Sequence, residues 1–167
     1  KKDGDVYGID PLRCEGCGVC VALCPAKAIA FPEKECGEWY VSDTRFGPFV
    51  HAQLYPGQEN SGRLVTLLKQ QARELAKRQG LDLVICDGSP GVGCPVISSL
   101  SGASLAVAVV EPTPSGRHDF ERVAALCDHF RIPVAVLINK ADLNHEEVQA
   151  ITRLADDKGY TVVGALP

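Results

Sequence analysis

A run of four cysteines near the start of the sequence restricts the fold of this chain more than any other feature. Cys14, Cys17, Cys20 and Cys24, followed by Pro25, form the pattern C-x2-C-x2-C-x3-C-P. This spacing suits a loop that curls tightly, so that several thiolates reach the corners of one cuboidal iron–sulfur cluster. The glycines at positions 16 and 18 allow such a turn. The run therefore predicts a [4Fe–4S] site.

Two questions about this site stay open at the level of sequence. Zinc is the alternative metal, although structural zinc sites usually take their ligands as two separated pairs. In two-cluster bacterial ferredoxins the fourth cysteine of such a run binds the other cluster. The first three cysteines then need another ligand. We expect it in a second run upstream of Lys1, which would allow up to two clusters in the intact protein; Cys36 is the alternative.

Composition and charge exclude several classes of protein. Four of the eight cysteines fall within eleven residues and the others are scattered through apolar segments. This distribution favours a metal centre in a reducing compartment, the cytoplasm, over a disulfide framework. The net charge of -4 argues against a nucleic-acid surface, and the short apolar runs exclude a membrane span. Because the sequence has no Met and stops just after an expected strand, we expect a fragment.

The second half of the chain opens on an apolar run that ends in an acidic residue. Leu81 to Cys86 has the pattern of a strand buried on both faces of a parallel sheet, and Asp87 follows it. A loop containing Gly88 and Gly91 comes next. An acid at this position can hold a magnesium-bound water, and glycines let backbone N–H groups approach a phosphate. The alternative is a strand that simply ends in a solvated aspartate.

Helices and strands are expected to alternate around this run. A hairpin is expected within 38–57, where a packed, hydrogen-bonded His51 is favoured over a metal ligand. The remaining expected elements are a short helix and strand at 26–31, a helix to Gln79 capped by Asn60 or Ser61, strands at 103–110, 133–138 and 160–163, a helix at 117–130, and a helix capped by Asn144 and Glu147 that ends at Gly159. Such alternation predicts a parallel α/β sheet.

Polar residues follow two of these expected strands. The first strand ends in a turn containing Pro112 and Thr113, at the start of a helix that could receive a phosphate. The next ends in Asn139-Lys140-Ala141-Asp142. In an N-K-x-D sequence the amide can pair with a purine edge, the lysine stem can cover the ring, and the carboxylate can accept from guanine N–H groups. These residues predict a nucleotide site.

Taken together, these blocks resemble the MinD-type P-loop ATPases that contain an inserted ferredoxin domain, in the deviant-Walker class. The resemblance rests on residues 14–25, 47–65, 86–99, 111–123 and 138–144, in that order. It implies a ferredoxin-like module at 1–36 and a P-loop NTPase-like α/β domain at 37–167.

The resemblance also implies a function and a set of site residues. It implies a dimeric ATPase that uses ATP with Mg²⁺, with Asp87 near the metal and Gly91 in the loop that senses the γ-phosphate. Gly88, Pro112, Thr113, Asn139, Lys140 and Asp142 would border the nucleotide or the dimer seam. ATP binding would be coupled to electron transfer or to cluster chemistry, with a redox or cluster-accepting protein as partner.

The sequence departs from that family in one respect. It contains no G-x-x-x-x-G-K-[ST] motif, which supplies the phosphate cradle and its lysine. We therefore expect this chain by itself to hydrolyse ATP poorly or not at all. The alternative function is a non-enzymatic [4Fe–4S] electron-transfer module that uses the α/β domain for docking. A third interpretation, a GTPase, rests on Asp142.

Overall fold

The computed structural model describes residues 2–3, 6–10, 14, 16–33, 35–58 and 62–167 of the chain. The chain forms two compact units, residues 1–82 and 83–167, each with its own packing. The expected helix caps Asn60 and Ser61 lie outside the described residues. The domain boundaries expected from the sequence, 1–36 and 37–167, stay a prediction.

The first unit begins with short elements around the cysteine run. Strands β1 (Lys2–Asp3) and β2 (Val6–Tyr7) pair antiparallel, and helix α1 (Val19–Leu23) carries Cys20. Residues 26–31, expected to form a helix and a strand, form neither. This segment lies between Pro25 and Pro32, and no described strand pairs with it.

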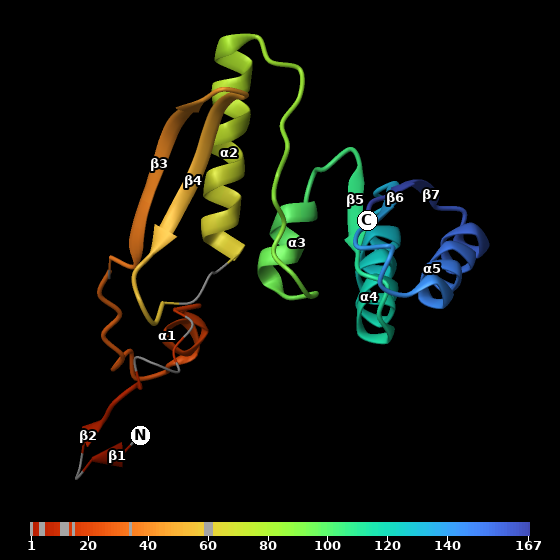
Figure 1. Cartoon of the computed structure of the whole chain (residues 1–167). Coiled ribbons are helices and arrows are strands. Elements are labelled where there is room, and N and C mark those ends of the chain that lie inside the picture. Colours follow the sequence, from red (N-terminus) through yellow and green to blue (C-terminus); the bar gives the residue numbers. More distant parts are fainter. Residues whose placement is uncertain (1, 4–5, 11–13, 15, 34, 59–61) are drawn as a thin grey trace. The chain divides into compact units, whose positions relative to one another are not determined.

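An antiparallel hairpin and a long helix make up the rest of the first unit (Figure 1). Strands β3 (Gly37–Thr44) and β4 (Gly47–Leu54) pair along their whole length, which confirms the expected hairpin. Gly47 follows the two-residue loop with a φ of 121°, a conformation that L side chains rarely adopt. Helix α2 (Gly62–Gln79) lies against β4, with Leu64, Leu68, Ala72 and Leu75 half-buried as expected for its apolar stripe.

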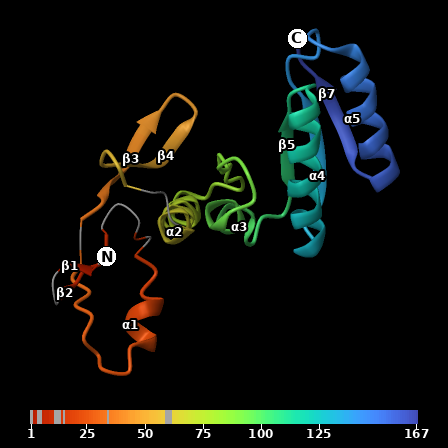
Figure 2. The same ribbon diagram turned by 90° about the horizontal axis from the view of Figure 1, so that it is seen from below.

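The second unit contains a parallel three-stranded sheet (Figure 2). Strand β6 (Val134–Ile138) lies between β5 (Ala106–Val110) and β7 (Thr161–Ala165). Both pairings are parallel, which confirms the parallel arrangement expected for these three strands. The helices of this unit are α3 (Cys94–Leu100), α4 (Pro114–His129) and α5 (His145–Lys158). Helix α4 begins three residues before its expected start because Thr113, not a later residue, caps it.

One face of this sheet carries the hydrophobic core. Phe120 and Cys127 of α4 and Ile151 of α5 pack against Val110, Val136 and Ile138. Because these strand residues alternate along each strand, α4 and α5 cover the same face. On the opposite face of the outer strands, Val107, Val109 and Val163 are 53%, 62% and 58% exposed. The sheet is therefore covered by helices on one side within this unit.

The expected buried strand at Leu81–Cys86 is wrong for this structure. Residues 81–89 have no regular secondary structure, and Leu83 and Ile85 are 73% and 84% exposed. A parallel strand is stable only when neighbours pair with its backbone and cover both faces. No described strand pairs with this segment, so its apolar pattern is not matched by a strand.

Candidate functional sites

The cysteine loop has the backbone conformation expected of a tightly curled segment. Gly16 and Gly18 have φ values of 63° and 73°, and Gly18 is the N-cap residue of helix α1 in this left-handed conformation. All four thiols of the run are free. Cys14, Cys17 and Cys20 are exposed and Cys24 is half-buried. The thiols are therefore accessible to a metal.

The sulfur atoms are not gathered around a common point. Among the residues described, no three Cys, His, Asp or Glu side chains are placed where they could hold one metal ion. The donor set nevertheless fits an iron–sulfur cluster, because it consists of free thiols on a glycine-containing loop. A chain carrying a cluster would have to draw these sulfurs inward.

The carboxyl edge of the parallel sheet holds most of the residues predicted to border a nucleotide. The N–H of Asn139 donates to the carbonyl of Val110, at 2.9 Å, which joins the ends of β5 and β6. Lys140 follows with a φ of 57°. Its ammonium group lies 2.5 Å from the Oε1 atom of Glu111. The structure thus brings Asn139 and Lys140 beside the turn that contains Pro112 and Thr113.

Glu111 is the residue that sequence reasoning missed at this edge. It is the first residue after β5, a position where open α/β sheets place polar ligand-binding groups. The charged end of Lys140 pairs with this carboxylate, and the expected contact of its stem with a purine ring stays a prediction. The signal available in the sequence was the acidic residue that immediately precedes Pro112.

The start of α4 is ordered by a side-chain cap. Thr113 Oγ1 accepts a hydrogen bond from the Gly116 N–H at 3.0 Å. Gly116 is required for this close turn, because a Cβ atom there would lie 2.4 Å from the Glu111 carbonyl oxygen. Pro112 is among the most deeply buried side chains. The cap and the buried proline hold Glu111 and Thr113 in one close turn at the start of α4.

Asp87, Gly88, Gly91 and Asp142 are not joined to this cluster. Asp87, Gly88 and Gly91 lie in an exposed segment before α3, and Gly91 has a φ of 89°. No hydrogen bond or ion pair within the described part of the chain links them to Glu111, Thr113 or Lys140. Asp142 is exposed beyond Lys140. The structure therefore assembles only part of the predicted nucleotide site.

The predicted cap of α5 is confirmed for Asn144 but not for Glu147. Asn144 Oδ1 accepts hydrogen bonds from the N–H groups of Glu146 and Glu147, at 3.1 and 3.2 Å. Glu147 was expected to complete a capping box, but its carboxylate instead accepts a hydrogen bond from the Nε atom of Arg117 in α4, at 3.0 Å. The ion pair between helices has replaced the local contact.

His51 is packed, as the sequence predicted. Its Nε2 lies 2.9 Å from Ser42 Oγ, and its ring stacks between those of Tyr40 and Phe49, with centroids 5.3 and 4.8 Å away. These neighbours account for its position without a metal.

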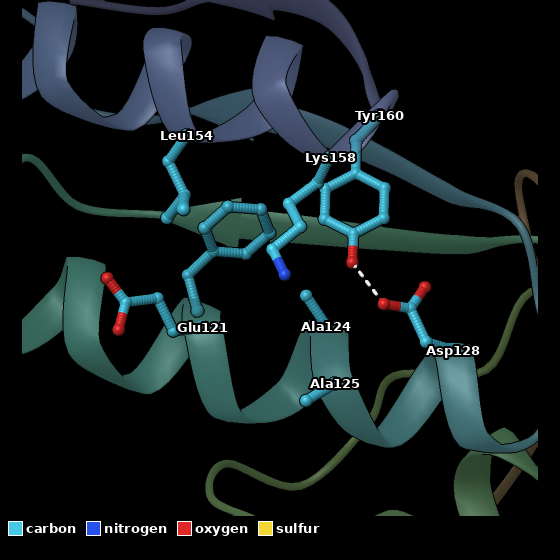
Figure 3. Close-up of a pocket in the computed structure, with 8 residues that line it drawn as sticks. Glu121, Ala124, Ala125, Asp128, Leu154, Lys158 and Tyr160 are labelled. Atoms are coloured by element: carbon cyan, nitrogen blue, oxygen red, sulfur yellow. Dashed lines mark hydrogen bonds between the residues drawn. The ribbon is translucent and has the colours of Figure 1, made fainter.

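A cavity of about 350 Å³ lies between α4 and α5, at the opposite end of the sheet from the predicted nucleotide site. Figure 3 shows Glu121 and Asp128 on α4, and Leu154 and Lys158 on α5. The Tyr160 hydroxyl donates to Asp128 Oδ2 at 2.6 Å. Burial, followed by this hydrogen bond, raises the pKa of Tyr160 to about 12. The phenol therefore stays protonated throughout the neutral range.

Comparison with known proteins supports the cluster site. Residues 7–30 match the 4Fe-4S binding domain family. Over 139 residues the chain is 34% identical to the uncharacterized protein MJ0578 of Methanocaldococcus jannaschii, covering 83% of this chain and 49% of that protein. It is 23% identical over 145 residues to MJ0579 of the same organism, covering 87% of this chain and 51% of the relative. The chain thus spans about half the length of these curated relatives.

No solved structure matches the chain significantly. In the described part of the chain, no helix has the length and apolar character needed to cross a membrane. The match at residues 7–30 identifies a 4Fe-4S binding segment, and the segment contains all four cysteines of the run.

Proposed function

We propose that this chain is a [4Fe–4S] electron-transfer module in which the loop from Cys14 to Cys24 binds the cluster. The observation that carries the proposal is the four-cysteine run inside the segment that matches the 4Fe-4S binding domain family. A bound cluster would supply a one-electron redox centre. The exposure of Cys14, Cys17 and Cys20 supports this function, because an electron carrier must present its centre close to a partner protein.

The residues of the loop have separate tasks in this proposal. Thiolates of Cys14, Cys17 and Cys20 bind one cluster, and the left-handed conformations at Gly16 and Gly18 let the loop curl around it. The fourth ligand is Cys36 or a residue of a longer protein, in which Cys24 would serve a second cluster. Because thiolate ligands must stay reduced, we place the protein in the cytoplasm.

The cluster is tested by metal content and spectroscopy on anaerobically purified chain. We expect about four iron atoms and as many acid-labile sulfides per cluster, with a [4Fe–4S] EPR signal after reduction. Cys20→Ser should abolish the signal, whereas Cys94→Ser, which changes an exposed thiol outside the run, should retain it. Cys36→Ser decides whether the fourth ligand lies in this chain. Stoichiometric zinc in place of iron would refute the proposal.

We further propose that the module belongs to a MinD-type ATPase, in which ATP with Mg²⁺ binds at the carboxyl edge of the parallel sheet. The arrangement of Glu111, Thr113 and Lys140 at the ends of adjacent strands supports a ligand site at this edge. Asp87 and Gly91 would act at the metal and the γ-phosphate once nucleotide orders their loop. Two chains would form the dimer, and nucleotide would control docking of the redox or cluster-accepting partner.

Nucleotide binding and turnover are tested separately. The 167-residue chain lacks the Walker A lysine, so we expect no magnesium-dependent phosphate release from ATP. A natural protein of the relatives' length should bind ATP in preference to GTP, and nucleotide should change the potential or accessibility of its cluster. If ATP does not change the reduction potential of the cluster, the ATPase proposal is refuted and the electron-transfer proposal is retained. Measurable ATP hydrolysis by this chain alone would contradict the prediction that hydrolysis requires the Walker A motif.

A further inference from the structure

A second cavity, of about 220 Å³, lies at the open end of the β3–β4 hairpin. It is lined by Glu38, Tyr40, Gln53, Leu54, Tyr55 and Pro56. Glu38 faces Gln53 across the ladder and Tyr40 faces His51, so these residues project from one face of the hairpin. The cavity belongs entirely to the first unit and is separate from the cysteine run and from the parallel sheet.

The backbone around this cavity is held by hydrogen bonds. The N–H of Tyr55 donates to the Cys36 carbonyl at 2.9 Å, which extends the ladder by one step beyond the strands. Gln58 N–H then donates to the Tyr55 carbonyl at 3.1 Å, closing a turn in which Gly57 has a φ of 77°. Pro followed by a positive-φ Gly is the signature of a type II turn. The Tyr55 side chain therefore starts from a fixed backbone.

The lining of the cavity contains one carboxylate, that of Glu38, and a second glutamate, Glu35, acts electrostatically on Tyr55. The Tyr40 hydroxyl donates to Glu38, and this hydrogen bond raises the pKa of Tyr40. Desolvation raises the pKa of Tyr55, with further contributions from Glu35 and Glu38. Within the part of the chain that the structure describes, neither glutamate forms an ion pair with Lys, Arg or His.

The lining chemistry selects one class of ligand. Aromatic rings attract cations to their faces, a carboxylate supplies a charge-assisted hydrogen bond, and an amide oxygen accepts another. A metal ion is disfavoured because the lining offers a single carboxylate and no Cys or His side chain. An organic cation with several N–H donors matches the site better than a metal ion or an anion.

We propose that the cavity at Glu38, Tyr40 and Tyr55 binds the guanidinium or ammonium group of an Arg or Lys side chain from a partner protein. The complementarity of charge argues for this occupant: the lining offers one carboxylate, one amide and two phenol rings. The site does not depend on the proposed electron-transfer function, since none of its residues belongs to the cysteine run. If the chain carries electrons, the cavity supplies a contact that orients its redox partner.

The probe is the peptide acetyl-Gly-Arg-Gly-amide, titrated into the full chain labelled with ¹³C at the tyrosine Cζ atoms. The chain has four tyrosines. We expect saturable shifts at Tyr40 and Tyr55, while Tyr7 and Tyr160 serve as internal references. The citrulline peptide, which keeps the shape without the charge, should bind at least about fivefold more weakly. Equal binding of the two peptides, or equal shifts at all four tyrosines, would overturn the proposal.

Matched variants locate the interaction. Glu38→Gln keeps an acceptor for the Tyr40 hydroxyl but removes the charge, and should weaken binding of the Arg peptide about fivefold or more. Tyr55→Leu removes a ring from the lining and should also weaken it. Glu74→Gln changes an exposed carboxylate on α2 and should have no effect. Unchanged binding by Glu38→Gln would refute the site even if the chain carries a full cluster.

Discussion

Lys140, in a left-handed conformation at the end of β6, places its ammonium group 2.5 Å from the carboxylate of Glu111 at the end of β5. The ion pair joins the side chains that follow two adjacent strands, next to the predicted nucleotide-binding residues. Both side chains are about half exposed, at 51% and 48%. Solvent and salt therefore keep its contribution to stability below about 1 kcal/mol.

Backbone strain at Lys140 can be measured with a pair of substitutions. Lys140→Gly and Lys140→Ala both remove the ion pair, but only glycine relieves the positive φ. After the larger conformational entropy of unfolded glycine is allowed for, we expect the glycine variant to be more stable by roughly 0.5–1 kcal/mol. Urea unfolding followed by far-UV circular dichroism measures the difference. Arg153→Gly and Arg153→Ala, inside α5, should show the opposite order.

The Tyr160–Asp128 hydrogen bond predicts a loss of stability at alkaline pH. The pKa of Tyr160 is about 12 in the folded chain and ordinarily near 10. Below pH 10 the phenol is protonated in both states and its contribution is constant. Between about pH 10 and pH 12 the unfolded chain releases the proton first, so the free energy of unfolding falls.

Tyr160→Phe should remove this part of the pH dependence and, at neutral pH, lower the free energy of unfolding by about 1 kcal/mol. Other tyrosines and lysines also titrate in this range, so the quantity to compare is the difference between the two chains at each pH. A difference that stays constant from pH 8 to pH 12 would contradict the assigned pKa.

Gly116 predicts a steric effect at the start of α4. A Cβ atom at this position would lie 2.4 Å from the Glu111 carbonyl oxygen. We expect Gly116→Ala to lower the free energy of unfolding by roughly 1–3 kcal/mol, the cost of a forced backbone shift. Gly93→Ala is the control, because the nearest atom to its Cβ would be 3.6 Å away. Thermal unfolding of the two variants should separate them clearly.

The exposure of the thiols predicts their order of reaction. Cys127 is 1% exposed, and burial, followed by the charge of Asp128, raises its pKa. A thiol-specific reagent applied to the metal-free, reduced chain should therefore modify Cys127 last, and only as the chain unfolds. Six cysteines are exposed and should react first, with Cys24 slower. Mass spectrometry of peptides from partly labelled chain gives the order, and early labelling of Cys127 would contradict the packing of α4.

Features that depend on short-range chemistry could be predicted from the sequence. Asn144 caps α5 because its side chain reaches N–H groups two and three residues ahead, whatever the rest of the chain does. The hairpin follows from the alternation of residues along its two strands, and the parallel pairing of β5, β6 and β7 follows from the helical connections between them.

Features that depend on residues far away in the sequence could not be predicted. The apolar run Leu81–Cys86 reads as a buried strand, but a strand exists only when another pairs with it. Glu147 has the right position for a capping box, yet Arg117, thirty residues earlier, takes its carboxylate. Lys140 likewise pairs with Glu111 of another strand end. The spacing of the cysteines specifies a donor set, whereas the position of each sulfur depends on what the loop encloses.

The uncovered face of the parallel sheet also affects the thermodynamics of unfolding. Val107, Val109 and Val163 are already largely hydrated in the folded unit. Their contribution to the heat-capacity change of unfolding, and to its dependence on denaturant, is correspondingly small. The second unit should therefore have a flatter stability curve than other chains of its length. A protein surface that covers these valines would increase the heat-capacity change of unfolding and so sharpen the curvature of the stability curve. Calorimetry can therefore detect such a partner without a structure of the complex.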